Sequence, residues 1–502
     1  MSMSQDFVSG LLEFPPDKQL SAKEYDKRAH NFVAGLSKQT ASQWSKTVNK
    51  ANVLDLLNPA ENSISYLFAL TAQARGAGKD KSKHEDALSR AAVFFATFDP
   101  IQIRYAGECF FALFDAILDT YHKLIITDCS PLTTALLRLD PTGATFTLLH
   151  LRLLRTCLAA GAPSHALPLL DKNITAYPTI LPKALPDELL CEDHAHSNAF
   201  ITIKSGFTLH PIKSEWILEY YLLGAHIYLG QRNFPRARLF LEYILLYPTG
   251  GTAPSALQAE AFKKWLLLGL LAQGKPYPIP RTHSQQIIKS LKQACRPYEV
   301  LAETFEKRAW RKFHAEADAG LNIWQDDGNT RLVREASEAL IRWRVLDLQN
   351  TYFTLPVSRV AAHLDYPPDV ALALLNSMIE LSYLDAHITP SPSDASTPVL
   401  HFHTSSAQAS VTTPVDSLEA QAARITTLIS AIRDADRRLQ LTKEYVEVQK
   451  RNKRGAAGPD GDLADQMDVT YDPPNVGNWD DNGGEGSGGG PMGEAEEDIM
   501  ER

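Results

Sequence analysis

Apolar residues recur at three- and four-residue spacings along most of the chain, which is the pattern of amphipathic helices. Clear examples are residues 110–121, where Phe110, Phe114 and Tyr121 share one face, and the leucine-rich residues 148–158. Convincing period-two alternation is almost absent before residue 346. The pattern therefore predicts an all-α protein whose helices are separated by short segments rich in Pro, Gly and Asn.

A weak internal repeat is superimposed on these helices. Three predicted helix ends carry an aromatic residue shortly followed by proline, at Pro100, Pro178 and Pro248, and the prolines lie 78 and 70 residues apart. The last unit, with Gly224 and Ala237 at small-residue positions, resembles a tetratricopeptide repeat, in which two antiparallel helices approach closely. A single hairpin cannot bury its apolar face alone, so we expect the units to stack into a solenoid.

The pattern changes after residue 346, where short strands and short helices alternate. The predicted elements are, in order, a strand at 351–355, a helix at 356–364, a helix at 369–381 and strands at 383–388 and 399–403. The buried face of the second helix should carry Val370, Leu374, Met378 and Leu381. This order of elements is typical of a winged helix, with residues 389–398 as an extended wing.

Residues 415–450 predict one long helix. Ile425, Leu428, Ile432 and Leu439 follow a near-heptad apolar seam along it. From residue 455 onward, Gly-rich and acidic runs predict disorder, because they cannot bury enough apolar surface to fold. No later domain is therefore expected to cover the seam, which should bind partner helices.

The net charge is distributed unevenly along the chain. Residues 455–502 carry thirteen Asp and Glu against one basic residue, Arg502, a net charge of −12. Subtracting this from the total of −9 leaves the preceding residues at +3, which is no general nucleic-acid footprint. The predicted segments are helical repeats at 1–200, further repeats at 201–345, a winged helix at 346–410, an assembly helix at 411–454 and a disordered acidic tail at 455–502.

The cysteines and the apolar runs bear on the compartment. The five cysteines are solitary and odd in number, which favours reduced thiols over disulfides or zinc ribbons. The N-terminus, MSMSQDFVSG, lacks the basic and apolar regions of a secretory signal, and no apolar run reaches the length of a membrane span. We therefore expect an intracellular protein with no membrane contact.

The core positions of the predicted winged helix form a pattern of their own. They are Leu355, Ser358, Val360, Ala361, Leu364, Val370, Leu374, Met378, Ile379, Leu384, Ala386, Ile388 and Phe402. With these residues, the chain from Trp216 onward resembles the PCI family, named for the proteasome lid, the COP9 signalosome and the eukaryotic translation initiation factor. The likeness is closest to signalosome members and spans about Tyr220 to Lys450.

This resemblance implies a non-catalytic scaffold subunit of the signalosome, a complex that deneddylates cullin-RING ubiquitin ligases. It implies flanking contacts with subunits 1 and 8. The winged helix would join neighbouring subunits, and the terminal helix would enter a shared bundle. The expected partner-binding residues are Val399, Phe402, Ile425, Leu428, Ile432 and Leu439. A scaffold of the proteasome lid or of the initiation factor is the alternative in the same class.

A winged helix also allows a nucleic-acid binder, which is the alternative from a different class. Its second helix commonly enters the major groove, and phosphate contacts there need Lys or Arg. Residues 369–381 contain no basic residue, and neither does the wing. We therefore expect no nucleic-acid partner.

No motif predicts an enzyme, a cofactor or a metal site. The signalosome's zinc isopeptidase motif has Ser and Asp at fixed places after His-x-His. After His194 and His196 these places hold Lys204 and Phe207; after the pair His401 and His403 they hold Val411 and Pro414. Residues 76–79 resemble a phosphate loop but lack its first glycine and its Ser or Thr. The histidines are more simply read as solvent-facing or capping residues.

One basic pattern bears on localisation. Arg437 and Arg438, an eleven-residue spacer and the basic cluster 450–454 have the layout of a bipartite nuclear-import signal. The alternative is a solvated helix face with cations at its C-terminal end. We expect the protein in both cytoplasm and nucleus.

Overall fold

A computed structural model describes most of the chain. The described residues are 5–15, 20–44, 47–48, 51–78, 80–178, 189–192, 197–208, 211–248, 253–280, 285–390, 398–403, 418–419, 421–429, 432–433 and 448. They fall into two units, Met1–His403 and Thr404–Arg502, each described separately below.

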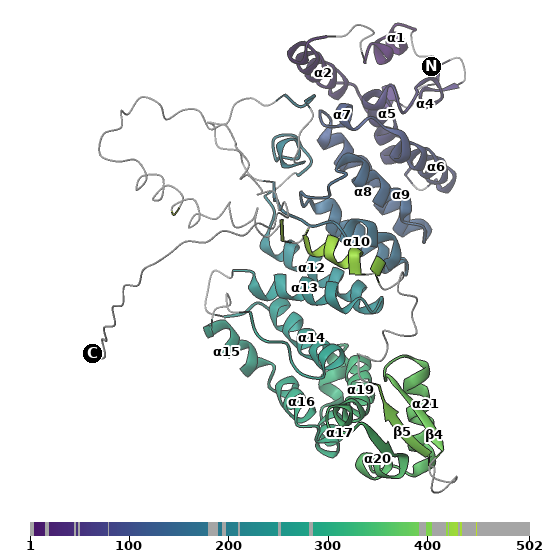
Figure 1. The fold of residues 1–502 in the computed structure, drawn as a ribbon. Helices are drawn as coiled ribbons and strands as arrows, with labels where there is room; N and C mark the ends of the chain where they lie inside the picture. The colour runs from purple at the N-terminus through teal and green to yellow at the C-terminus, as the bar shows by residue number, and fades with distance from the viewer. Residues whose placement is uncertain are drawn as a thin grey trace, which may run out of the picture. The chain divides into compact units, whose positions relative to one another are not determined.

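Helices dominate the first unit, which confirms the predicted fold class (Figure 1). The N-terminal elements are α1 (Gln5–Leu12), α2 (Ala22–Ser37), α3 (Ala41–Trp44), β1 (Thr47–Val48), β2 (Ala51–Asn52) and α4 (Val53–Leu56). The middle elements are α5 (Ser63–Gly76), α6 (Lys81–Thr97), α7 (Pro100–Ile103), α8 (Gly107–Leu124), α9 (Ser130–Leu139), α10 (Leu148–Ala159), η1 (Pro163–Ala166), α11 (Leu167–Leu170) and η2 (Ser197–Ala199). The later helices are α12 (Ser214–Gly230), α13 (Phe234–Leu246), α14 (Ala256–Gln273), α15 (Gln285–Ala294), α16 (Arg296–Glu306), α17 (Trp310–Ala319), α18 (Leu321–Asp326) and α19 (Thr330–Gln349).

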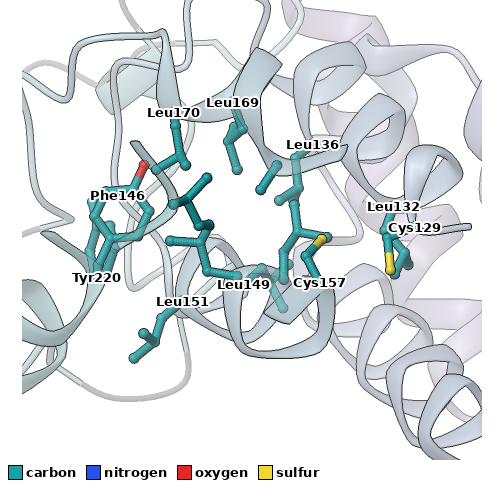
Figure 2. Packing of buried hydrophobic residues seen from close by; sticks show 14 of the residues in the cluster. Cys129, Leu132, Leu136, Phe146, Leu149, Leu151, Cys157, Leu169, Leu170 and Tyr220 are labelled. Carbon is teal, nitrogen blue, oxygen red and sulfur yellow. The ribbon is translucent and has the colours of Figure 1, made fainter. Parts of the chain in front are cut away.

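The apolar residues that predicted the helices are the ones that these helices bury. In α8, Phe110, Phe114 and Tyr121 all lie in the core. In α10 the buried residues are spread around the helix, because neighbours cover it on more than one side. Figure 2 shows Cys157 of α10 beside Leu136 of α9, while Phe146 and Tyr220 lie together at the other end of the cluster. Most of the stability of such a helix comes from this packing rather than from its own hydrogen bonds.

The hairpin of α12 and α13 confirms the tetratricopeptide-like unit. A Cβ atom added at Gly224 would lie 2.6 Å from the ring of Phe240, so only glycine permits this approach of the two helices. Ala237 is fully buried in the same contact region. Tyr247 caps the C-terminal end of α13, and Pro248 follows it where the helix stops.

One of the three predicted aromatic–proline helix ends is wrong. Phe98 caps α6, and Tyr247 caps α13, as predicted. Tyr177 instead follows an extended residue, Ala176, which forms a parallel bridge with Thr145. The sequence pattern is the same in all three places, but here the aromatic side chain packs on Phe146 from a connector rather than from a helix.

Beyond α19 the chain forms a winged helix. Its elements are β3 (Thr354–Pro356), α20 (Val357–Leu364), α21 (Pro368–Glu380), β4 (Ala386–Pro390) and β5 (Pro398–Phe402). The three strands form an antiparallel sheet in the order β3-β5-β4, so the last strand lies between the other two. The register pairs Leu355 with Leu400 and Ala386 with Phe402, which places these apolar residues on the inner face.

The predicted buried face of the second helix in this module is only partly correct: Met378 is buried and Leu374 packs half-buried against the core, but Val370 and Leu381 do not. Val370 and Leu381 are each more than half exposed, whereas Ala371, Leu375 and Met378 are buried. The helix is therefore rotated from the predicted orientation by about one residue. Residues 370–375 are all apolar, so their spacing alone does not select a face.

Two hydrophobic cores meet along α19. One core runs through the repeats and ends with Ala339 and Leu340 on this helix. The other begins with Val345 and Leu348 on the same helix and fills the winged helix. The predicted boundary at residues 345/346 thus falls inside a continuous helix rather than in a linker.

In the second unit, the described residues 418–419, 421–429, 432–433 and 448 are helical. They lie within the predicted long helix 415–450. The remaining residues of that helix and of the tail 455–502 lie outside the described residues.

Candidate assembly surfaces

The described helical residues of the second unit carry an exposed apolar stripe. Ile425, Leu428 and Ile432 expose 56%, 53% and 65% of their surface. Their spacings of three and four residues place them on one side of a helix. Removing aligned, exposed aliphatic side chains such as these from water lowers the free energy, which makes this a candidate surface for a partner.

The stripe is longer than the sequence reasoning indicated. Leu418 and Ile429 are also exposed aliphatic residues. Leu418, Ile425 and Ile432 follow one another at intervals of seven, while Ile429 flanks Leu428. A heptad search extended upstream from Ile425 would have found Leu418. We call Leu418, Ile425, Leu428, Ile429 and Ile432 the terminal stripe; Leu439, which the heptad spacing would add, lies outside the described residues.

The winged helix is held against the repeats by polar contacts as well as by α19. The indole Nε1 of Trp310 donates to Oδ2 of Asp365 at 3.1 Å, and the guanidinium of Arg311 lies 3.5 Å from the same oxygen. The Arg344 guanidinium donates to the backbone carbonyl of His363. Burial, together with that nearby cation, lowers the pKa of His363. These contacts fix α20 relative to α17 and α19.

The two predicted contact residues on β5 have different environments. Val399 is half-buried at the start of the strand. Phe402 is only 3% exposed and packs within the core of the winged helix. Its side chain therefore supports the sheet from inside, and a direct contact between this ring and a partner would require the core to open.

The second helix of the winged helix offers no phosphate contacts. α21 contains no Lys or Arg and has Asp369 in its first turn and Glu380 at its end. Its exposed face instead presents apolar residues, Val370 and, just past its end, Leu381. This chemistry fits a protein surface better than a DNA backbone.

The pair formed by His401 on β5 and His403 just after it has a neighbour that sequence reasoning missed. His387 on β4 lies directly opposite His401 and also contacts His403. Only the strand register reveals that these histidines are neighbours, since His387 is fourteen residues away from His401 in the chain. His194 and His196 lie outside the described residues. Within the part of the chain that the structure describes, no three His, Cys, Asp or Glu side chains are arranged to hold a metal ion.

Residues 27–287, just over half of the chain, match the family model described as COP9 signalosome complex subunit 3, N-terminal helical repeats. The chain belongs to this family.

Curated COP9 signalosome subunit 3 proteins extend the similarity over most of the chain. The one from Emericella nidulans is 28% identical over 419 residues, which is 80% of this chain and 83% of the relative. The one from Neurospora crassa is 28% identical over 359 residues, or 70% and 71% of the two chains. The one from Dictyostelium discoideum is 24% identical over 404 residues, or 80% and 88%.

Membership of the subunit 3 family decides among the three complexes that share the PCI module. The matched region also covers the repeats before about Tyr220, where the sequence alone showed only helical texture in common with the family. Among the described helices, none combines the length and the hydropathy needed to cross a membrane.

Proposed function

We propose that this chain is a non-catalytic scaffold subunit of the COP9 signalosome. Its membership of the subunit 3 family and its similarity to relatives named as signalosome subunits support this role. The observation that carries the scaffold role is the terminal stripe, a row of exposed aliphatic residues on a helix. No described cluster offers metal ligands for the zinc chemistry of an isopeptidase.

The terminal stripe supplies the main assembly contact in this proposal. An isolated amphipathic helix is marginal in water, and partner helices are the natural way to bury its apolar side. Burying each large aliphatic residue contributes on the order of 1.5–3 kcal/mol. Burial of Ile425, Leu428 and Ile432 would therefore favour docking of the helix into a shared bundle.

The winged helix supplies a second contact. The exposed residues of α21 and the half-buried Val399 on β5 lie on a module that α19 fixes to the repeats. The proposed neighbours are signalosome subunits 1 and 8, inside a complex that removes a ubiquitin-like modifier from cullin-RING ligases. The proposed compartments are cytoplasm and nucleus, with residues 437–454, which lie mostly outside the described residues, as the candidate import signal.

The test compares charges placed on and off the terminal stripe. Ile425→Asp with Ile432→Asp places two carboxylates on the stripe. Ala423→Asp with Thr427→Asp places two on the opposite side of the same helix, at residues that are also exposed. Each variant of the full chain is expressed with a tag, and co-purified subunits are quantified by mass spectrometry.

The proposal expects the stripe variant to lose the other signalosome subunits while the control keeps them. Circular dichroism and thermal melting of each isolated variant should match the wild type, because the substituted side chains are exposed and their replacement removes little packing. A stripe variant that enters the complex at wild-type yield would refute the role of the helix. Recovery of proteasome-lid subunits instead would refute the assignment of the complex.

A further inference from the structure

Three imidazole rings stack on the outer face of the winged-helix sheet. The ring of His387 on β4 lies parallel to that of His401 on β5, with centroids 4.9 Å apart and planes 11° apart. It also stacks on His403, with centroids 4.7 Å apart and planes 22° apart. His401 and His403 share this face because side chains two residues apart on a strand point the same way. We call these three residues the imidazole stack.

A single proton joins two of the rings. Nδ1 of His387 and Nε2 of His403 lie 3.0 Å apart, so one nitrogen donates and the other accepts. A neutral imidazole has one donor and one acceptor, whereas an imidazolium has two donors. A first proton can bind the other nitrogen of the donor ring, and the hydrogen bond is then kept. A second proton must bind the accepting nitrogen, and the hydrogen bond is then lost. Nε2 of His401 contacts the Thr389 hydroxyl at 2.8 Å, and this hydroxyl can accept or donate.

The surroundings offer little charge to offset further protons. Asp385 lies just before β4, and its backbone carbonyl accepts a hydrogen bond from the His403 amide. Among the described residues, Asp385 is the acidic residue next to the paired ends of β4 and β5. Thr354 on β3 lies opposite His401 and carries no charge, and the Gln349 amide binds the His403 carbonyl rather than its ring.

We propose that the imidazole stack makes the β4–β5 hairpin acid-sensitive: it clamps the two strands when neutral and loosens them when a second proton is bound. The hairpin is the outer part of the winged-helix sheet, and its inner face holds Leu400 and Phe402 in the core. Loosening it exposes that core at one edge. The stack lies at the surface, so solvent protons reach it without unfolding.

The direction of the effect follows from His387. Partial desolvation in the stack, and then repulsion from His403 and His401, lowers the pKa of His387 below its usual value. A group whose folded pKa is depressed stabilises the fold above its unfolded pKa, about 6.5 for histidine. That stabilisation is lost as the pH falls through the folded pKa. The hairpin is therefore tight at neutral pH and looser in mild acid.

The experiment measures hydrogen–deuterium exchange of the full chain at about pH 7.5 and about pH 5, on either side of the ordinary histidine range. Rates are corrected for the intrinsic effect of pH, and peptides of α20 serve as the internal reference. Repulsion between two unit charges 4.7 Å apart in water shifts the equilibrium between the paired and separated strands about fivefold. The protection of β4 and β5 amides from exchange should therefore fall by about that factor. The variant His387→Gln should abolish this pH dependence, and His122→Gln, at the end of α8, should retain it.

A second measurement does not depend on any variant. Exchange at the imidazole C2 position, followed by mass spectrometry, reports the titration of each histidine, and the pKa of His387 should lie below the ordinary histidine value of about 6.5. Equal protection of the hairpin at both pH values would overturn the proposal, as would an unchanged pH dependence in His387→Gln. A loss of protection caused by a metal chelator at neutral pH would also overturn it, because a bound metal would then be the clamp.

Discussion

Helix α10 and the terminal stripe are built from similar residues but end in opposite environments. α10 buries Leu149, Leu151 and Leu154 among its neighbours in the chain. The terminal stripe leaves Ile425 and Ile432 more than half exposed. Apolar content therefore does not distinguish a buried helix from an exposed one; coverage by other elements does. The comparison predicts that mutations in the two helices separate stability from assembly.

The largest expected effect is in α10. Leu154→Ala removes a fully buried side chain and should lower the free energy of unfolding by about 2–5 kcal/mol. Chemical denaturation of the full chain measures this, with an exposed leucine, Leu418→Ala, as the control. A loss in Leu154→Ala as small as that of the control would show that the core around α10 relaxes freely.

α10 also buries a titratable group, which the terminal stripe does not. Burial lowers the pKa of His150 from 6.5 to about 4. The stability that this depression reflects is present above pH 6.5 and is lost as the pH falls through about 4. The shift corresponds to about 3 kcal/mol. Unfolding measured across this range should show the loss in the wild type and a smaller loss in His150→Gln; parallel pH profiles would contradict the assignment.

A smaller effect is expected where two helices meet closely. Gly224→Ala places a methyl group against Phe240 and should cost about 1–3 kcal/mol through overpacking. Gly230→Ala, at the end of the same helix, meets no atom within 4 Å and has no positive φ, so it is the matched control. Thermal melting distinguishes the two. If both variants melt together, α12 and α13 can move apart at no cost.

The smallest effect on the isolated chain is expected in the terminal stripe. Ile425→Ala should change the free energy of unfolding by less than about 0.5 kcal/mol, because its side chain is exposed. The same variant should weaken co-purification with signalosome subunits. A large loss of stability without a partner would mean that the stripe packs on its own chain, and the contrast with α10 would disappear.

Much of the fold followed from sequence because local signals and packing agreed. The spacing of Phe110, Phe114 and Tyr121 identified both a helix and its buried side. In the winged helix, the order of elements was predicted correctly, but the buried face of α21 was predicted only in part, since the apolar run around Leu374 does not select one side of the helix. Helical periodicity needs polar residues on the opposite side to be informative.

The candidate surfaces were harder to predict than the core. The seam of the terminal helix was visible as a heptad pattern, although Leu418 and Ile429 were overlooked. The burial of Phe402 and the approach of His387 to His403 depend on which strands pair and in which register. Register is set by the whole sheet, so no local window of sequence contains it.

The sharing of α19 by two cores has a mechanical consequence. Leu340 is anchored in the repeats and Val345 in the winged helix, less than two turns further along the same helix. A twist of the winged helix about this axis would have to pull side chains out of both cores at once. The joint therefore resists torsion, and a displacement imposed on the winged helix is carried into α14 and α17, which pack on the same helix. A force applied to the winged helix is therefore expected to pass through α19 into the repeats.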